Sequence, residues 1–203
     1  MSHSSLINIT EVNSLDDKQF ERVFDNVIEL CPDAAVQVKN KRPFGNLADL
    51  CDAFNGYLDG LSVEEKLVVL QLHPDLAGRL AAQGELTRES AGEQRSAGLN
   101  QLTQEQKTLI DERNIRYKEK FGFPFIICAR ENKVQSIIEG LQWRYHNTRE
   151  EEITTGINEV KKICRPLNHC MRLPGYFTEF WSVEDVFEAN FKMSSTEDLI
   201  LEV

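Results

Sequence analysis

This sequence is poor in basic residues and has no long apolar run. It has 23 Lys and Arg against 33 Asp and Glu, a formal net charge of −10 at pH 7. That balance disfavours non-specific nucleic-acid binding, which needs cations to displace counterions from phosphates. No stretch approaches the roughly 18 apolar residues of a membrane helix, and no charged-then-apolar signal pattern opens the chain. We therefore expect neither nucleic acid nor membrane among its partners.

The same absences favour the cytoplasm. The last three residues, Leu201-Glu202-Val203, are not a peroxisomal address, so a peroxisomal location would have to be reached without that signal. The five cysteines are odd in number and irregularly spaced, which is typical of reduced thiols in an intracellular protein. Cys164, His169 and Cys170 match no paired zinc-ligand spacing, so we expect no metal site.

Two common catalytic signatures are missing as well. Arg88 stands two residues before Ser90, so the Gly-x-Ser-x-Gly pattern of serine hydrolases fails. No glycine-rich run ends in Gly-Lys-Ser or Gly-Lys-Thr, as a phosphate-cradling loop would. Serine hydrolases and P-loop nucleotide enzymes are therefore disfavoured.

Helical periodicity dominates what is present. Apolar residues recur at helical spacing, and capping boxes at Ser62 with Glu65 and at Thr103 with Gln106 mark helix starts. The apolar run 123–127 has no partner strand, so we interpret it as irregular backbone. The sequence predicts an all-α fold, a single-domain bundle of about seven or eight helices.

The chain divides into three parts by composition. Residues 1–13 are polar and are expected to be flexible, and residues 14–173 form the helical domain. Its first helix should begin with a capping box at Ser14 and end near Cys31. Residues 174–203 are an aromatic, acidic C-terminal extension with one lysine, too apolar for an inert tail. We expect it to pack on the domain or on a partner.

Three unusual strings lie within residues 71–130. They read HPDLAGR (73–79), SAGEQRSAGL (90–99) and KFGFPFIICAR (120–130). A plain helical bundle does not need Gly, Pro and polar groups at these positions, because Leu, Ala and surface charges serve it better. Chemistry is the better explanation of the strings.

Each string also has a plainer interpretation. Pro74 ends a helix, so His73 could be a partly exposed turn residue or a side chain aimed into a cleft. Glu93 could simply complete a capping box with Ser90, although Thr87 is an alternative start for that helix. The arginines in or near the strings could hold an anion or could be solvated helix-face charges: Arg79, Arg88, Arg95, Arg116 and Arg130.

Taken together, the strings resemble those of the OHCU decarboxylase family, and the resemblance runs from about Leu15 to Met171. That family acts on 2-oxo-4-hydroxy-4-carboxy-5-ureidoimidazoline (OHCU) in urate breakdown and yields (S)-allantoin. The resemblance implies an all-α, cofactor-free enzyme, commonly a homodimer, with a small anionic substrate. It assigns catalysis to His73 as the acid, with Glu93 beside it. The substrate-binding positions it implies are Pro74, Ser90, Ala91, Gly92, Gln94, Phe125, Ile126, Ile127, Cys128 and Ala129, with Arg165 as a further candidate.

The residue types suit that chemistry. The carboxyl-bearing carbon of OHCU adjoins a ring C=N that can accept the electron pair left by CO₂, so neither pyridoxal phosphate nor a metal is needed. His73, with an ordinary pKa near ~6.5, could supply a proton at neutral pH. Gln94 and the backbone of 126–129 suit a ligand rich in N–H and C=O groups.

One position departs from the family pattern. Members commonly carry an Arg-Leu-Arg run in the last core helix, and Leu167 stands where its second arginine would be. Either Arg165 or Arg172 takes its place, or activity is reduced or lost, so the alternative is a silent family member acting as an interaction module. The His73-Pro74-Asp75 tripeptide also resembles that of J-domain co-chaperones, but the helix before it offers only Lys66 where theirs is rich in Lys and Arg.

Overall fold

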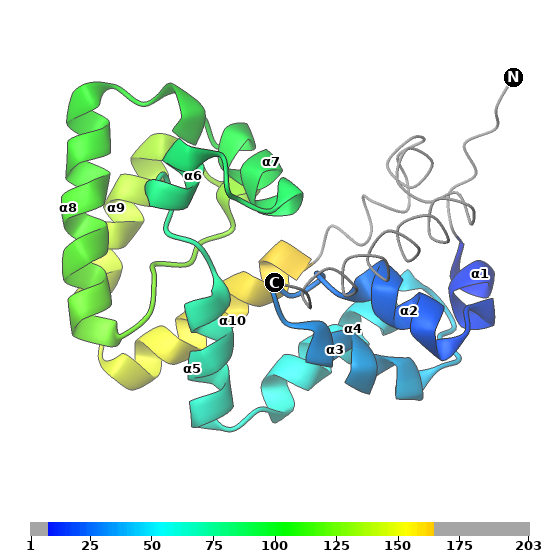
Figure 1. The fold of residues 1–203 in the computed structure, drawn as a ribbon. Coiled ribbons are helices and arrows are strands. Elements are labelled where there is room, and N and C mark those ends of the chain that lie inside the picture. Colours follow the sequence, from blue (N-terminus) through cyan, green and yellow to red (C-terminus); the bar gives the residue numbers. More distant parts are fainter. Residues whose placement is uncertain (1–7, 165–203) are drawn as a thin grey trace, which may run out of the picture.

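The computed structural model describes residues 8–164, where every regular element is a helix (Figure 1). The expected all-α fold is confirmed. None of these described helices is long and apolar enough to cross a membrane. The α-helices are α1 (Ile9–Ser14), α2 (Asp17–Phe24), α3 (Pro32–Val38), α4 (Leu47–Gly60), α5 (Val63–Leu72), α6 (Arg79–Gln83), α7 (Arg88–Ser96), α8 (Gln104–Phe121), α9 (Val134–Arg144) and α10 (Arg149–Cys164), and the 3-10 turns are η1 (Lys39–Lys41), η2 (Leu99–Gln101) and η3 (Ala129–Glu131).

The described residues thus hold ten α-helices, where the sequence predicted about seven or eight. Two of them, α1 and α6, are too short to give a clear periodic signal. The expected extension, 174–203, lies outside the described residues.

The N-terminal part is more ordered than the sequence suggested. An Asn8–Glu11 capping box starts α1, and Val12 is fully buried. The side chain of Asn13 accepts the N–H of Phe44 and donates to its carbonyl, both at 2.8 Å. The expectation of a flexible segment up to residue 13 is therefore wrong for residues 9–13.

The first long helix also differs from its expected bounds. Asp16 and Gln19 form the capping box of α2, in place of Ser14, and α2 ends at Phe24, well before Cys31. The chain then turns because the side chain of Asn26 accepts the N–H of Leu30, which has a positive φ of 51°. The capping boxes of Ser62 with Glu65 and of Thr103 with Gln106 were predicted correctly.

Helix α10 occupies the middle of the molecule. It packs on α4 and α5, while α8 packs on α9, and Figure 1 shows α10 between the α1–α4 group and the α6–α9 group. Gly156 allows the contact with α5, since a Cβ there would lie 2.8 Å from a Leu70 methyl carbon. The end of α10 thereby reaches the segments that carry the three strings.

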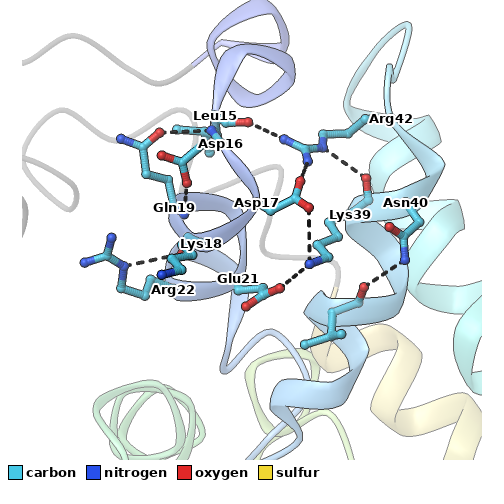
Figure 2. Close-up of polar contacts among 11 residues, drawn as sticks. Leu15, Asp16, Asp17, Lys18, Gln19, Glu21, Arg22, Lys39, Asn40 and Arg42 are labelled. Atoms are coloured by element: carbon cyan, nitrogen blue, oxygen red, sulfur yellow. Dashed lines mark hydrogen bonds and ion pairs between the residues drawn. The ribbon is translucent and has the colours of Figure 1, made fainter.

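Surface charges connect α2 to the turn after α3. Lys39 forms ion pairs with Asp17, at 3.4 Å, and with Glu21, and Arg42 contacts Asp17 and the carbonyl of Leu15 (Figure 2). Such half-exposed pairs contribute little individually, on the order of 0–1 kcal/mol each. They join the first turns of α2 to η1 and to the residue that follows it.

Candidate active site

His73 ends α5, as Pro74 predicted. Its extended backbone (φ −75°, ψ 142°) turns the imidazole inward, where only 9% of the residue is exposed. Nδ1 lies 3.0 Å from the Val69 carbonyl, so it carries the hydrogen and donates, while the buried Nε2 has no protein partner. Burial lowers the pKa of His73 to about 4. At neutral pH the ring is therefore neutral and presents an acceptor.

The loop after His73 is held by side chains from two other helices. Asn114 of α8 donates to the Leu76 carbonyl at 3.0 Å, and the side-chain oxygen of Gln94 accepts the Ala77 N–H at 2.9 Å. Ala77 has a positive φ of 52°, an unusual conformation for a residue with a Cβ. Because its oxygen is committed to this loop, the amide of Gln94 can offer a ligand only its N–H donors.

Helix α7 brings Glu93 to the same place. Thr87, and not Ser90, caps this helix, so Glu93 is not part of a capping box. The Glu93 carboxylate instead lies 3.4 Å from the Arg130 guanidinium and accepts the Arg130 N–H. Burial raises the pKa of Glu93 above its ordinary range, and the Arg130 charge opposes that rise. The protonated carboxyl is thus favoured more than in an exposed glutamate.

Residues 123–127 form irregular backbone, as predicted, and lead into η3. The expectation that backbone N–H groups of 126–129 are free for a ligand is wrong in part. The Cys128 N–H donates to Glu159 at 2.8 Å, and the Ala129 N–H bonds Glu93. The Cys128 thiol is fully buried, and burial raises its pKa to about 12, so it is an inert packing group.

These segments line a cavity that is partly open to solvent. Most of the predicted site residues line it: His73, Pro74, Ser90, Glu93, Gln94, Phe125, Ile126, Ile127 and Ala129. Ala91, Gly92 and Cys128 were also predicted and do not line it, and Arg165 lies outside the described residues. Ala91 lines a second pocket, which also includes residues of α6 and α8.

Three lining residues were missed from the sequence: Glu29, Leu76 and Ile163. Leu76 belongs to the first string, and Ile163 stands at helical spacing from the buried Val160 of α10, so both could have been found from local patterns. Glu29 follows no motif. No Lys or Arg is among the described residues that line the cavity.

The four described cysteines are buried and form no disulfide with one another, and between residues 8 and 164 no three His, Cys, Asp or Glu side chains gather as metal ligands would. His169 and Cys170 lie outside that range. The fold and the cavity define an all-α protein with an imidazole and a carboxyl group in one partly closed, largely apolar site.

Comparison with known proteins specifies the family. Residues 13–166 match the family model "OHCU decarboxylase". A "2-oxo-4-hydroxy-4-carboxy-5-ureidoimidazoline decarboxylase" from Amia calva is 42% identical over 159 residues, 78% of this chain and 91% of the relative. The chain belongs to the OHCU decarboxylase family.

Two solved structures share the fold. A crystal structure of (S)-allantoin synthase has a TM-score of 0.65 at 19% identity, and the match covers 81% of this chain and 54% of that one. A crystal structure of OHCU decarboxylase in the presence of (S)-allantoin has a TM-score of 0.58 at 22% identity, covering 77% and 96%. At these identities the likeness supports the helical fold.

Proposed function

We propose that this protein is a carboxy-lyase that converts OHCU to (S)-allantoin and CO₂ without a cofactor. One observation carries the assignment beyond family membership: the cavity pairs an unpartnered, neutral His73 Nε2 with the Glu93 carboxyl, whose pKa is raised by burial. A proton acceptor and a proton donor in one site are what this decarboxylation requires.

The chemistry balances with these two groups. When the C–C bond to the carboxylate breaks, its electron pair forms a ring C=C bond and the C=N pair moves to nitrogen. His73 Nε2 accepts the hydroxyl proton, which turns that oxygen into a carbonyl, and protons arrive on the ring nitrogen and the ureido-bearing carbon. Glu93 supplies one of them and His73 returns the other, so one proton is taken from solvent overall. Delivery from one fixed side accounts for a single enantiomer.

This mechanism changes the role that the sequence suggested for His73. We expected an acid with a pKa near neutrality, and burial instead gives a neutral imidazole that must first accept a proton. The departing carboxylate meets mostly apolar lining, from Leu76, Phe125 and Ile163 among others. Desolvation of a carboxylate there favours its conversion to neutral CO₂. The side chains of Ser90 and Gln94 then orient the ureido and ring groups of OHCU.

The direct test is turnover of freshly made OHCU. The substrate is generated in situ from urate with urate oxidase and hydroxyisourate hydrolase, and (S)-allantoin is followed by circular dichroism. We expect the signal to rise faster with the protein than without it or with heat-denatured protein. No acceleration by folded protein would contradict the proposal and favour the silent interaction module that Leu167 suggested.

We also propose that the chain forms a homodimer. Large apolar side chains on the described surface support a partner copy, with Trp143 77% exposed on α9 and Ile115 60% exposed on α8. Static light scattering on the purified full chain should give twice its 23.3 kDa mass. A monomer mass at micromolar concentration would rule the dimer out.

A further inference from the structure

Glu29 is a second acidic side chain of the cavity, and neither the strings nor the mechanism above uses it. It lies in the α2–α3 turn, far in sequence from His73, and only 8% of the residue is exposed. It lines the same cavity as His73 and Glu93. Burying a carboxyl group is costly unless it is hydrogen-bonded or neutral, so the burial of Glu29 calls for an explanation.

Its bonds connect the turn to the start of α7. The Glu29 carboxylate oxygen Oε1 accepts from the Thr87 hydroxyl at 2.8 Å, and Ser90 bonds the same carboxyl group. The Thr87 oxygen in turn accepts the Ser90 N–H at 3.2 Å as the helix cap. A second link runs from the amide of Asn26 to Glu89 at 3.2 Å. Helix α7 carries Ser90, Glu93 and Gln94, so the turn positions the helix that supplies the cavity's polar groups.

The backbone beside Glu29 is held in an uncommon conformation. Leu30 has a φ of 51°, and its N–H is bonded by the Asn26 side chain at 2.8 Å. Non-glycine residues adopt this left-handed region only rarely, and the conformation persists where the surroundings compel it. Leu30 itself is 56% exposed, so its own packing does not explain the conformation. The bend instead serves to direct Glu29 inward.

The groups around Glu29 determine whether its carboxyl group is protonated or charged. Burial raises its pKa, Glu89 and Glu93 on α7 add to that rise, and the Thr87 and Ser90 hydroxyls oppose it. On its own turn Asp25 is the nearest acid by sequence, and the neutral His73 at the end of α5 lines the same cavity. With no basic residue among the described lining, an ionised Glu29 would repel a ligand carboxylate.

We propose that Glu29 is a positioning and selectivity residue of this site: its carboxyl group fixes the first turn of α7, and its charge state sets how readily the cavity accepts an anion. The inference rests on the proposed function for its substrate. It predicts that KM for OHCU rises as Glu29 loses its proton, whereas loss of the Glu93 proton lowers kcat.

The test compares wild type, Glu29→Gln and the exposed control Glu112→Gln between pH 5 and 9. We expect KM of the wild type and the control to rise at least about fivefold across this range, and KM of Glu29→Gln to stay within about twofold of its value at pH 5. The amide keeps an acceptor for Thr87, so the KM profile of this variant reports the loss of the charge with the hydrogen bond to α7 retained. A flat wild-type KM, or parallel KM profiles in wild type and Glu29→Gln, would overturn the proposal.

Thermal unfolding separates this inference from the proposed function because it needs no turnover. A carboxyl whose pKa is raised by folding contributes stability below its unfolded pKa, and this stability is lost as pH rises through the folded pKa. Glu29→Gln should therefore gain in Tm relative to wild type between pH 4.5 and 8, even if no variant turns OHCU over. A Tm difference that is constant with pH would mean a purely structural role and would contradict the proposal.

Discussion

Replacing His73 with alanine is expected to lower kcat/KM for OHCU by roughly 10²- to 10⁴-fold, the usual contribution of a positioned proton-transfer group. The imidazole makes one hydrogen bond to the protein, from Nδ1 to the Val69 carbonyl, and its buried Nε2 has no partner, while the residue lines the cavity. The loss should therefore fall on catalysis and leave the helices intact. The measurement is initial-rate kinetics at pH 7, with far-ultraviolet circular dichroism as the check on folding.

His146→Ala is the matched control, because His146 is exposed just after the end of α9 and does not line the cavity. It should keep near-normal turnover. If His73→Ala does the same, His73 is not the proton acceptor. A pH profile adds a second criterion: since the pKa of His73 is about 4, wild-type kcat/KM should lose no activity to imidazole protonation between pH 8 and 6.

The low pKa of His73 also predicts how the free energy of unfolding changes as the pH falls. Its pKa is lower when folded than the ordinary 6.5, so the unfolded chain binds the proton more readily. The stability contributed by the neutral buried ring is present above pH 6.5 and is lost as pH falls toward 4. As the pH falls through that window, the free energy of unfolding should therefore decrease less steeply for His73→Ala than for the wild type.

What could be predicted from the sequence was local. Pro74 fixes where α5 ends, and Ser62 with Glu65 fixes where it starts, because those bonds join residues three or four apart. The three strings were close enough to a family pattern to point to one site. The bounds of α2 were missed because its end depends on the Asn26 side chain and on Leu30 adopting a positive φ, neither of which a periodic pattern reveals.

Contacts between distant segments could not be predicted. Glu29 reaches the cavity only because the α2–α3 turn is bonded to Thr87, and no spacing in the sequence indicates that pairing. The Cys128 N–H was expected to serve a ligand, yet Glu159 of α10 uses it. In both cases a carboxylate from a segment distant in sequence bonds a polar group, and only the packing of the chain decides which one.

Glu152 is the clearest example of such long-range support, and it carries the largest expected effect on stability. It is fully buried at the start of α10, where it pairs with Arg144 and accepts hydrogen bonds from Tyr117 and, at 2.6 Å, from Asn147. Glu152→Leu leaves the Arg144 charge without its partner, and we expect a loss of about 3–5 kcal/mol in the free energy of unfolding. Denaturant titration of the purified variant measures it.

The loss should also reach the active site. Arg144 donates to the Ile126 carbonyl at 2.7 Å and lies over the Phe125 ring, 4.5 Å from its centroid, so the ion pair anchors one wall of the cavity. We expect kcat/KM to fall along with stability, whereas the exposed Glu150→Gln on the same helix should change unfolding by less than about 0.5 kcal/mol.

A double variant tests whether Glu152 and Arg144 act as a pair. Glu152→Leu with Arg144→Met should be more stable than Glu152→Leu alone, because no unpaired charge remains buried. If it were less stable by the full sum of the two single changes, the pair would not be coupled and Arg144 would hold the wall without Glu152.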